Sequence, residues 1–220
     1  MGSDQVRLVT VSATYGAGGS TVAPALAKRL GVPFLNRATT STGGSSGPEP
    51  CFERLEPEEA ALTPAHRLLA ALGGTMPIGA TQSPLPTHHQ DRSLRQQCEA
   101  GIRRLAGDGA GVILGRGAAV VLGRNQGFHV RLDGPPDLRA VQGAAIEGVE
   151  PDEARRRLTV ADRSRDAYVR RLYRANPADT RYYHLVIDST AMPLDAVTEL
   201  IVRALASVSA AVPAPREAAR

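Results

Sequence analysis

The sequence predicts one α/β domain, built on a parallel five-stranded sheet with helices on both faces. Short apolar runs alternate with helical patterns along the chain, which is typical of parallel sheets covered by helices. The first run leads into a glycine-rich turn and then a helix. The chain has 220 residues, 42% of them hydrophobic, so it can bury one ordinary core. Only 4% are aromatic, so this core must be aliphatic.

The first unit is a strand at about 6–12, a turn, and a helix at about 19–30 that Gly31 closes. Glycines let backbone N–H groups turn toward an anion, and a helix N-terminus adds partial positive charge. Compared with the phosphate-binding pattern G-x-x-x-x-G-K-[ST], Ala13 replaces the first glycine and Gly19 replaces the lysine. We expect this turn to bind phosphate; a purely structural turn is the alternative.

A short strand at 33–35 follows, and then a long segment of low regularity. Residues 38–90 are rich in Gly, Pro, Ser and Thr, and they predict a loop-rich insert with one weak helix at about 57–72. The pair His88-His89 is interpreted as part of a solvated loop, because no third ligand is suitably placed. A helical stripe begins at about Asp91.

The run at 111–114 has no polar break, as expected of a central parallel strand. It ends in Gly115-Arg116-Gly117. Ligands of open α/β sheets collect beyond the carboxyl ends of strands, so we expect Arg116 to lie beside the glycine-rich turn. Another strand at 128–132 contains His129, which we interpret as a strand residue and not as a catalytic base. Pro135-Pro136 then open a helix.

The longest helix is predicted at about 151–174, with proline and acidic residues in its first turn. Arg165 falls in the middle of its apolar face. A charge in that position needs a partner or must reach beyond the stripe, and Asp162 is the candidate partner. Arg163 and Arg170 fall on the opposite face, where a solvated surface is the alternative to a functional role.

The last strand is predicted at 183–190, and a helix opens at Pro193. We expect one domain over 1–206 and a disordered tail over 207–220, because the tail is rich in Ala, Pro and Arg.

The composition argues against several classes of protein. The net charge is +4 and Lys28 is the only lysine, which also fits the codon bias of a high-GC genome. A nucleic-acid binder needs basic patches interleaved with aromatics, which are scarce here. No apolar run is long enough to span a membrane, and the first residues lack a signal peptide. Cys51 and Cys98 match no metal spacing, so reduced thiols and a cytoplasmic location are expected.

Five motifs in order resemble the cytidylate kinase-like family, a branch of the P-loop nucleoside monophosphate kinases. They are Tyr15-Gly16-Ala17-Gly18-Gly19-Ser20, Gly31-Val32-Pro33-Phe34-Leu35-Asn36-Arg37, the Val-Ile-Leu-Gly-Arg-Gly run at 112–117, the set Asp162, Arg165 and Tyr168, and the run at 183–189. The likeness covers roughly residues 6–37 and 92–206.

The resemblance implies ATP-dependent transfer of a phosphoryl group to CMP or dCMP. The donor phosphates would lie on Gly16, Ala17, Gly18, Gly19, Ser20 and Thr21, with Ser20 also on Mg²⁺. The acceptor nucleotide would contact Arg116, Arg95 and Asp162. The helix at 151–174 would act as a lid, whose catalytic arginines are Arg165 and its neighbours Arg163 and Arg170. The insert at 38–90 would correspond to the monophosphate-binding part.

Two other functions stay open. A non-catalytic nucleotide-binding regulatory module is one, because Gly19 stands in place of the loop lysine and Gly117 in place of an acid of cytidylate kinases. A nucleic-acid binder is the other, but it rests on net charge alone. The sequence does not indicate an oligomeric state.

Overall fold

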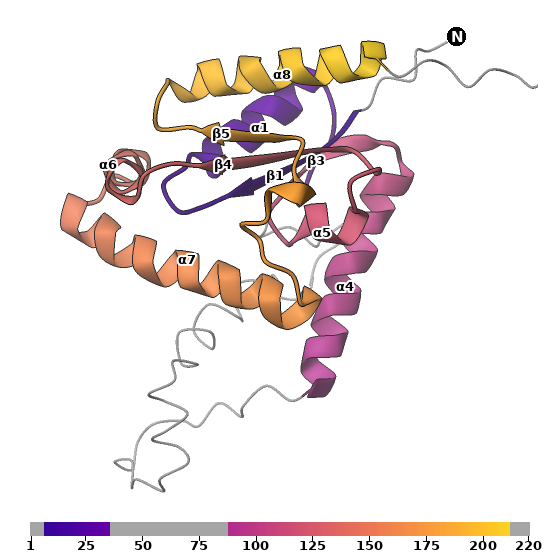
Figure 1. The fold of residues 1–220 in the computed structure, drawn as a ribbon, viewed down its shortest axis with the longest axis horizontal. Coiled ribbons are helices and arrows are strands. Elements are labelled where there is room, and N and C mark those ends of the chain that lie inside the picture. The colour runs from indigo at the N-terminus through magenta and orange to yellow at the C-terminus, as the bar shows by residue number, and fades with distance from the viewer. Residues whose placement is uncertain (1–6, 36–87, 212–220) are drawn as a thin grey trace, which may run out of the picture.

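The computed structural model describes residues 7–35 and 88–211. A five-stranded sheet in the order β2-β3-β1-β4-β5 forms its centre, and every pairing is parallel. Helices cover both faces of this sheet (Figure 1). The predicted fold class is therefore confirmed.

The strands are close to their predicted positions. Their bounds are β1 Arg7–Ala13, β2 Phe34–Leu35, β3 Ala110–Leu114, β4 Phe128–Asp133 and β5 Leu185–Asp188. The helices are α1 Gly19–Leu30, α4 His88–Gly107, α5 Ala118–Leu122, α6 Pro136–Glu147, α7 Pro151–Tyr173 and α8 Leu194–Ala211, with a short 3₁₀ helix at Thr180–Tyr182.

Alternate residues of the central strands build two cores. Val9, Val112 and Phe128 are register partners on neighbouring strands and belong to the larger core, which α1 and α8 cover. On the other face, Leu8 and Ile113 pack with residues of α4 and α5. This burial on both faces explains why the sequence of β3 has no polar break. Both cores together fix where the carboxyl ends of the strands lie.

The structure departs from the sequence predictions in a few places. His88-His89 begin α4 and do not lie in a loop. The last strand is shorter than predicted, since it covers only Leu185–Asp188 and is followed by a turn. Helix α8 continues to Ala211, so its end lies beyond the predicted boundary at 206. The weak helix at 57–72 and most of the 38–90 insert lie outside the described residues. Within 7–35 and 88–211, no helix is long and apolar enough to cross a membrane.

His129 is a buried residue of β4 that bonds to the neighbouring strand and to the loop before β4. Its side chain is fully buried. The Nε2 atom donates to the Gly123 carbonyl at 2.8 Å, which makes Nδ1 the acceptor for the Thr10 hydroxyl at 2.8 Å. Thr10 is its register partner on β1. Burial holds the pKa of His129 below its usual value, and the pKa of His184 beside it is lowered for the same reason.

These pKa shifts predict a loss of stability in weak acid. The unfolded chain takes up protons on these imidazoles below about pH 6.5, whereas the fold keeps them neutral. The free energy of unfolding should therefore fall between pH 7.5 and pH 5.5, by at most about 1.4 kcal/mol per pH unit for each group. His129→Gln should lower stability at neutral pH by about 1–3 kcal/mol and make this pH dependence shallower.

Urea unfolding at several pH values measures this effect. His184 still titrates in the variant, so part of the slope should remain. Equal slopes for the variant and the native protein would contradict the assignment to His129.

Candidate functional site

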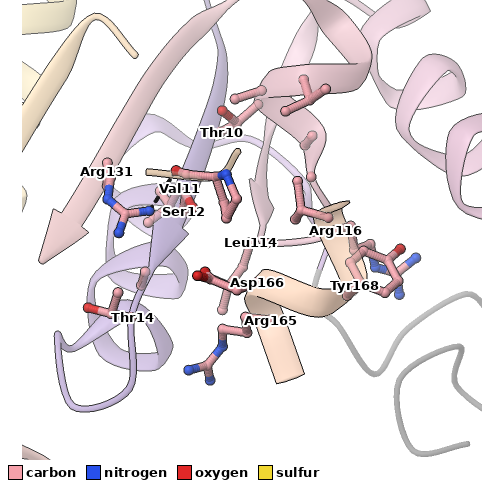
Figure 2. A pocket seen from close by; sticks show the side chains of 18 of the residues that line it. Thr10, Val11, Ser12, Thr14, Leu114, Arg116, Arg131, Arg165, Asp166 and Tyr168 are labelled. Carbon is pink, nitrogen blue, oxygen red and sulfur yellow. Dashed lines mark hydrogen bonds between the residues drawn. The ribbon is translucent and has the colours of Figure 1, made fainter. Parts of the chain in front are cut away.

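A pocket opens at the carboxyl edge of the sheet, where β1 lies between β3 and β4. The ends of these strands line one side and helix α7 lines the other (Figure 2). The connection after β1 runs toward β2, whereas the connection after β4 runs toward β5 at the other edge of the sheet. Open α/β sheets bind ligands where the direction of the connections changes in this way. The cavity measures about 60 Å³ in this structure.

Arg116 lines the pocket from the end of β3, as predicted. Its side chain is only 2% exposed, and its backbone has φ 60° between two glycines of positive φ. A non-glycine residue in this region is strained, and such strain is concentrated at functional sites. Gly117 has a second constraint, because a Cβ there would meet the Tyr173 ring at 2.7 Å. An acidic side chain at 117 would therefore have no room.

The glycine-rich turn is closely packed from several sides. Gly16 and Gly18 have φ 73° and 75°, a conformation that suits glycine. A Cβ on Gly16 would collide with the Arg139 carbonyl of α6, and one on Gly18 would meet Leu194 of α8 at 2.5 Å. The turn thus leads into α1 with Gly18 as its N-cap residue, and no side chain caps it.

The two departures from the lysine-bearing pattern fit each other. A Cβ on Gly19 would lie 2.5 Å from the Ala13 Cβ and 3.2 Å from Leu114 Cδ1. The methyl group of Ala13 therefore occupies the space in which a lysine at position 19 would begin. Ala13 and Gly19 therefore form a packing pair, and the turn is packed for a glycine at position 19.

Helix α7 places Arg165 and Asp162 at the pocket. Arg165 lines the cavity and extends toward the side on which Thr14 lies, whereas Tyr168 lies on the opposite side (Figure 2). The predicted ion pair is also present, with 3.5 Å between Arg165 Nη1 and Asp162 Oδ1. Asp162 contacts the turn itself, since it accepts the Tyr15 N–H at 2.8 Å.

Two further carboxylates lie at this edge, and the sequence did not single them out. Asp133, at the end of β4, accepts from Arg131 at 2.7 Å and from the Thr14 hydroxyl at 3.0 Å. Burial alone would raise the pKa of Asp133, but these partners hold it below its usual range. Asp166 on α7 faces the pocket, and burial raises its pKa.

Helix α6 contributes Arg139, which the sequence also left unnoticed. This side chain is buried and pairs with Asp162 at 2.7 Å. Asp133 could have been found from its position at the end of a strand. Arg139 gave no such signal, because its partners lie on other elements.

The remaining predicted site residues lie outside the cavity. Arg163 and Arg170 are exposed on α7, and Arg170 is 3.7 Å from Asp166. Arg95 faces the junction of α4 and α7, where it pairs with Glu99 at 2.6 Å and donates to the Leu172 carbonyl at 3.2 Å. The structure therefore brings Arg116, Asp162 and Arg165 together near the start of the turn, and it gives Arg95 an interhelical contact instead. Residues 16–21 adjoin the pocket without lining it.

Comparison with solved structures finds similar folds at low identity. A protein from Eubacterium ventriosum of uncharacterised function has a TM-score of 0.61 at 18% identity, over 91% of this chain and 99% of its own. A gluconokinase from Sinorhizobium meliloti has a TM-score of 0.48 at 18% identity, over 93% and 94%. A shikimate kinase from Acinetobacter baumannii has a TM-score of 0.46 at 17% identity, over 93% and 96%. These likenesses concern the fold alone.

Among curated proteins, the sequence comparison finds no match to this chain. The family comparison does find one, and it agrees with the motifs in the sequence. The model of the cytidylate kinase-like family matches residues 8–191, which is most of the chain. The chain therefore belongs to the cytidylate kinase-like family.

Proposed function

We propose that this protein is an ATP-dependent nucleoside monophosphate kinase of the cytidylate type, with CMP or dCMP as acceptor. The observation that supports it most is the convergence of three parts of the chain. Thr14 at the start of the glycine-rich turn, Arg116 after β3 and Arg165 on α7 line one pocket. Family membership points to the same chemistry. A cytoplasmic location is part of this proposal.

The start of α1 suits the phosphates of ATP. The first N–H groups of a helix have no partners within that helix, and they favour anions. Gly18 brings no capping side chain, and the first turn of α1 has no acidic residue to oppose a phosphate. Ser20 is exposed beside it. Residues 16–21 therefore fit the donor phosphates in both charge and shape.

Mg²⁺ would be held mainly by the substrate. Within the described residues, no group of three His, Cys, Asp or Glu side chains is placed to hold a metal ion. Mg²⁺ commonly uses one or two protein ligands together with substrate phosphates and water. The Ser20 hydroxyl suits that arrangement, and the ion would supply positive charge at the phosphates.

Arginines replace the charge that the loop lysine provides elsewhere. Phosphoryl transfer depends on positioning and on neutralising the charge that is spread over the transferred group. Arg165 and Arg116 bring two permanent cations to the pocket. Arg163 and Arg170 lie on the same helix and stay predicted neighbours of the phosphates.

In this proposal α7 moves when substrate enters and leaves. Helix α7 forms one wall of the pocket and is the predicted lid. Closing such a lid over bound substrate excludes water and completes the catalytic set.

A coupled assay with ATP, Mg²⁺ and a panel of nucleoside monophosphates tests this function. We expect turnover, with CMP or dCMP preferred. Arg165→Ala should lower kcat by about 10²–10³-fold, because a cation aimed at developing charge is lost. Arg156→Ala is the matched control, since Arg156 is exposed on the same helix and pairs with Glu153.

No turnover with any acceptor would overturn the kinase proposal. Calorimetry would then show whether ATP or CMP binds without reaction, which is what the regulatory nucleotide-binding module predicts.

The packing of Ala13 on Gly19 gives a second prediction. Gly19→Lys should lower the free energy of unfolding by about 1–3 kcal/mol, because its Cβ overpacks the turn. Adding Ala13→Gly should recover part of this loss, so the double variant should be more stable than the sum of the two single changes. Chemical denaturation of the four proteins measures the coupling. Strict additivity would contradict the packing pair.

A further inference from the structure

Arg139 connects three parts of the molecule that meet at the glycine-rich turn. Its side chain is 7% exposed. The Nε atom donates to the Gly134 carbonyl after β4 at 2.9 Å. The Nη1 atom donates to the Tyr15 carbonyl at 2.9 Å and to Asp162 Oδ2 at 2.7 Å. One buried guanidinium on α6 thus holds the loop after β4, the turn and the lid helix.

Asp162 completes this connection from α7. Its Oδ2 atom pairs with Arg139, while its Oδ1 atom accepts the Tyr15 N–H at 2.8 Å. Both polar groups of the Tyr15 backbone are therefore bonded within the same small network. The next turn of α7 carries Arg165, whose Nη1 lies 3.5 Å from Asp162 Oδ1.

We propose that Arg139 is a positioning residue, which works through Asp162 to dock the lid helix on the glycine-rich turn and so places Arg165 at the pocket. This inference rests on the proposed function. We call the contacts among Arg139, Asp162 and Tyr15 the latch. In this proposal Asp162 holds the lid, whereas the sequence predicted that it binds the acceptor nucleotide.

The physical basis is a charge-assisted pair shielded from water. Hydrogen bonds between ionised groups are roughly twice as strong as neutral ones. Removal of one partner leaves the other charge buried and uncompensated. The side chains of Arg139 and Asp162 are 7% and 24% exposed, so solvent screens this pair little. Opening α7 would break the contacts to the turn, and closing it would restore them together with the position of Arg165.

The same two helices offer a matched control. Arg157 on α7 pairs with Glu147 on α6 at 2.9 Å, with side-chain exposures of 46% and 37%. Exposed pairs contribute little to stability. Arg157 joins the two helices away from the backbone of the turn, although its partner Glu147 also accepts the Tyr15 hydroxyl at 2.8 Å. Its removal separates the effect of the latch from that of a general helix–helix contact.

The experiment compares the full-length native protein with Arg139→Gln and Arg157→Gln. Backbone hydrogen exchange is measured first, without ligand. In Arg139→Gln we expect the Tyr15 amide and the amides of α7 after Asp162 to exchange about ten- to a hundredfold faster, since a charged hydrogen bond is lost. The amides of β1 and β4 should keep their protection. Arg157→Gln should exchange like the native protein.

Steady-state kinetics with ATP and the preferred acceptor then follow. Arg139→Gln should lower kcat more than it changes the KM of either substrate. Arg165 acts only when the lid is closed, and the variant no longer holds it in place there. Arg139→Lys keeps the charge and should restore part of kcat. If Arg139→Gln does not fold, Asp162→Asn replaces it, with the same localised increase in exchange expected.

Unchanged exchange at Tyr15 in the variant that folds would overturn the latch, as would a uniform increase across the whole sheet. If the native protein turns over no acceptor, the proposed kinase function fails, while exchange at Tyr15 still decides whether the latch exists.

Discussion

The absence of spare volume around the glycine-rich turn is the constraint on which the rest of the site depends. Helix α6 packs its backbone against Gly16, α8 packs Leu194 against Gly18, and the methyl group of Ala13 lies against Gly19. None of these positions accepts a larger side chain in the present backbone. The turn therefore keeps one shape, and its N–H groups stay at the start of α1, where an anion is favoured. The missing lysine is a consequence of this packing.

At the carboxyl edge of the sheet, the charges of carboxylates and arginines balance each other. Three carboxylates gather there, and arginines from three different elements accompany them: Arg131 pairs with Asp133, Arg139 with Asp162, and Arg170 approaches Asp166. Of these residues, Arg131, Asp162 and Asp166 line the pocket. The side chains of Arg116 and Arg165 line it as well. We expect Arg116 and Arg165 to bind a phosphate group without a lysine in the loop, because arginine suits phosphate geometry.

The sequence predicted the sheet, the turn and two of the arginines because each left a local signal. Apolar runs marked the strands, Arg116 came just after the end of a strand, and Arg165 interrupted an apolar stripe. Arg139 and the latch could not be predicted, because Arg139 meets Tyr15 and Asp162 from 124 and 23 residues away. Arg95 was predicted from its spacing to Arg116, but spacing along a helix does not tell which neighbour the helix faces. Its contacts to Glu99 and the Leu172 carbonyl lie outside the pocket, and its role at the acceptor stays a prediction. Substrate preference also left no local signal, and most of the insert at 38–90 lies outside the described residues.

The central claim is that a lysine-free turn binds the donor phosphates at the start of α1. The most direct measurement is the backbone amide spectrum of residues 16–21 during titration with Mg²⁺ and a non-hydrolysable ATP analogue. The account predicts that the amides of Gly18, Gly19 and Ser20 shift most and saturate with the analogue, because their N–H groups would bind phosphate oxygens. Saturable binding that leaves these three amides unmoved would contradict it, since the nucleotide would then lie elsewhere on the protein.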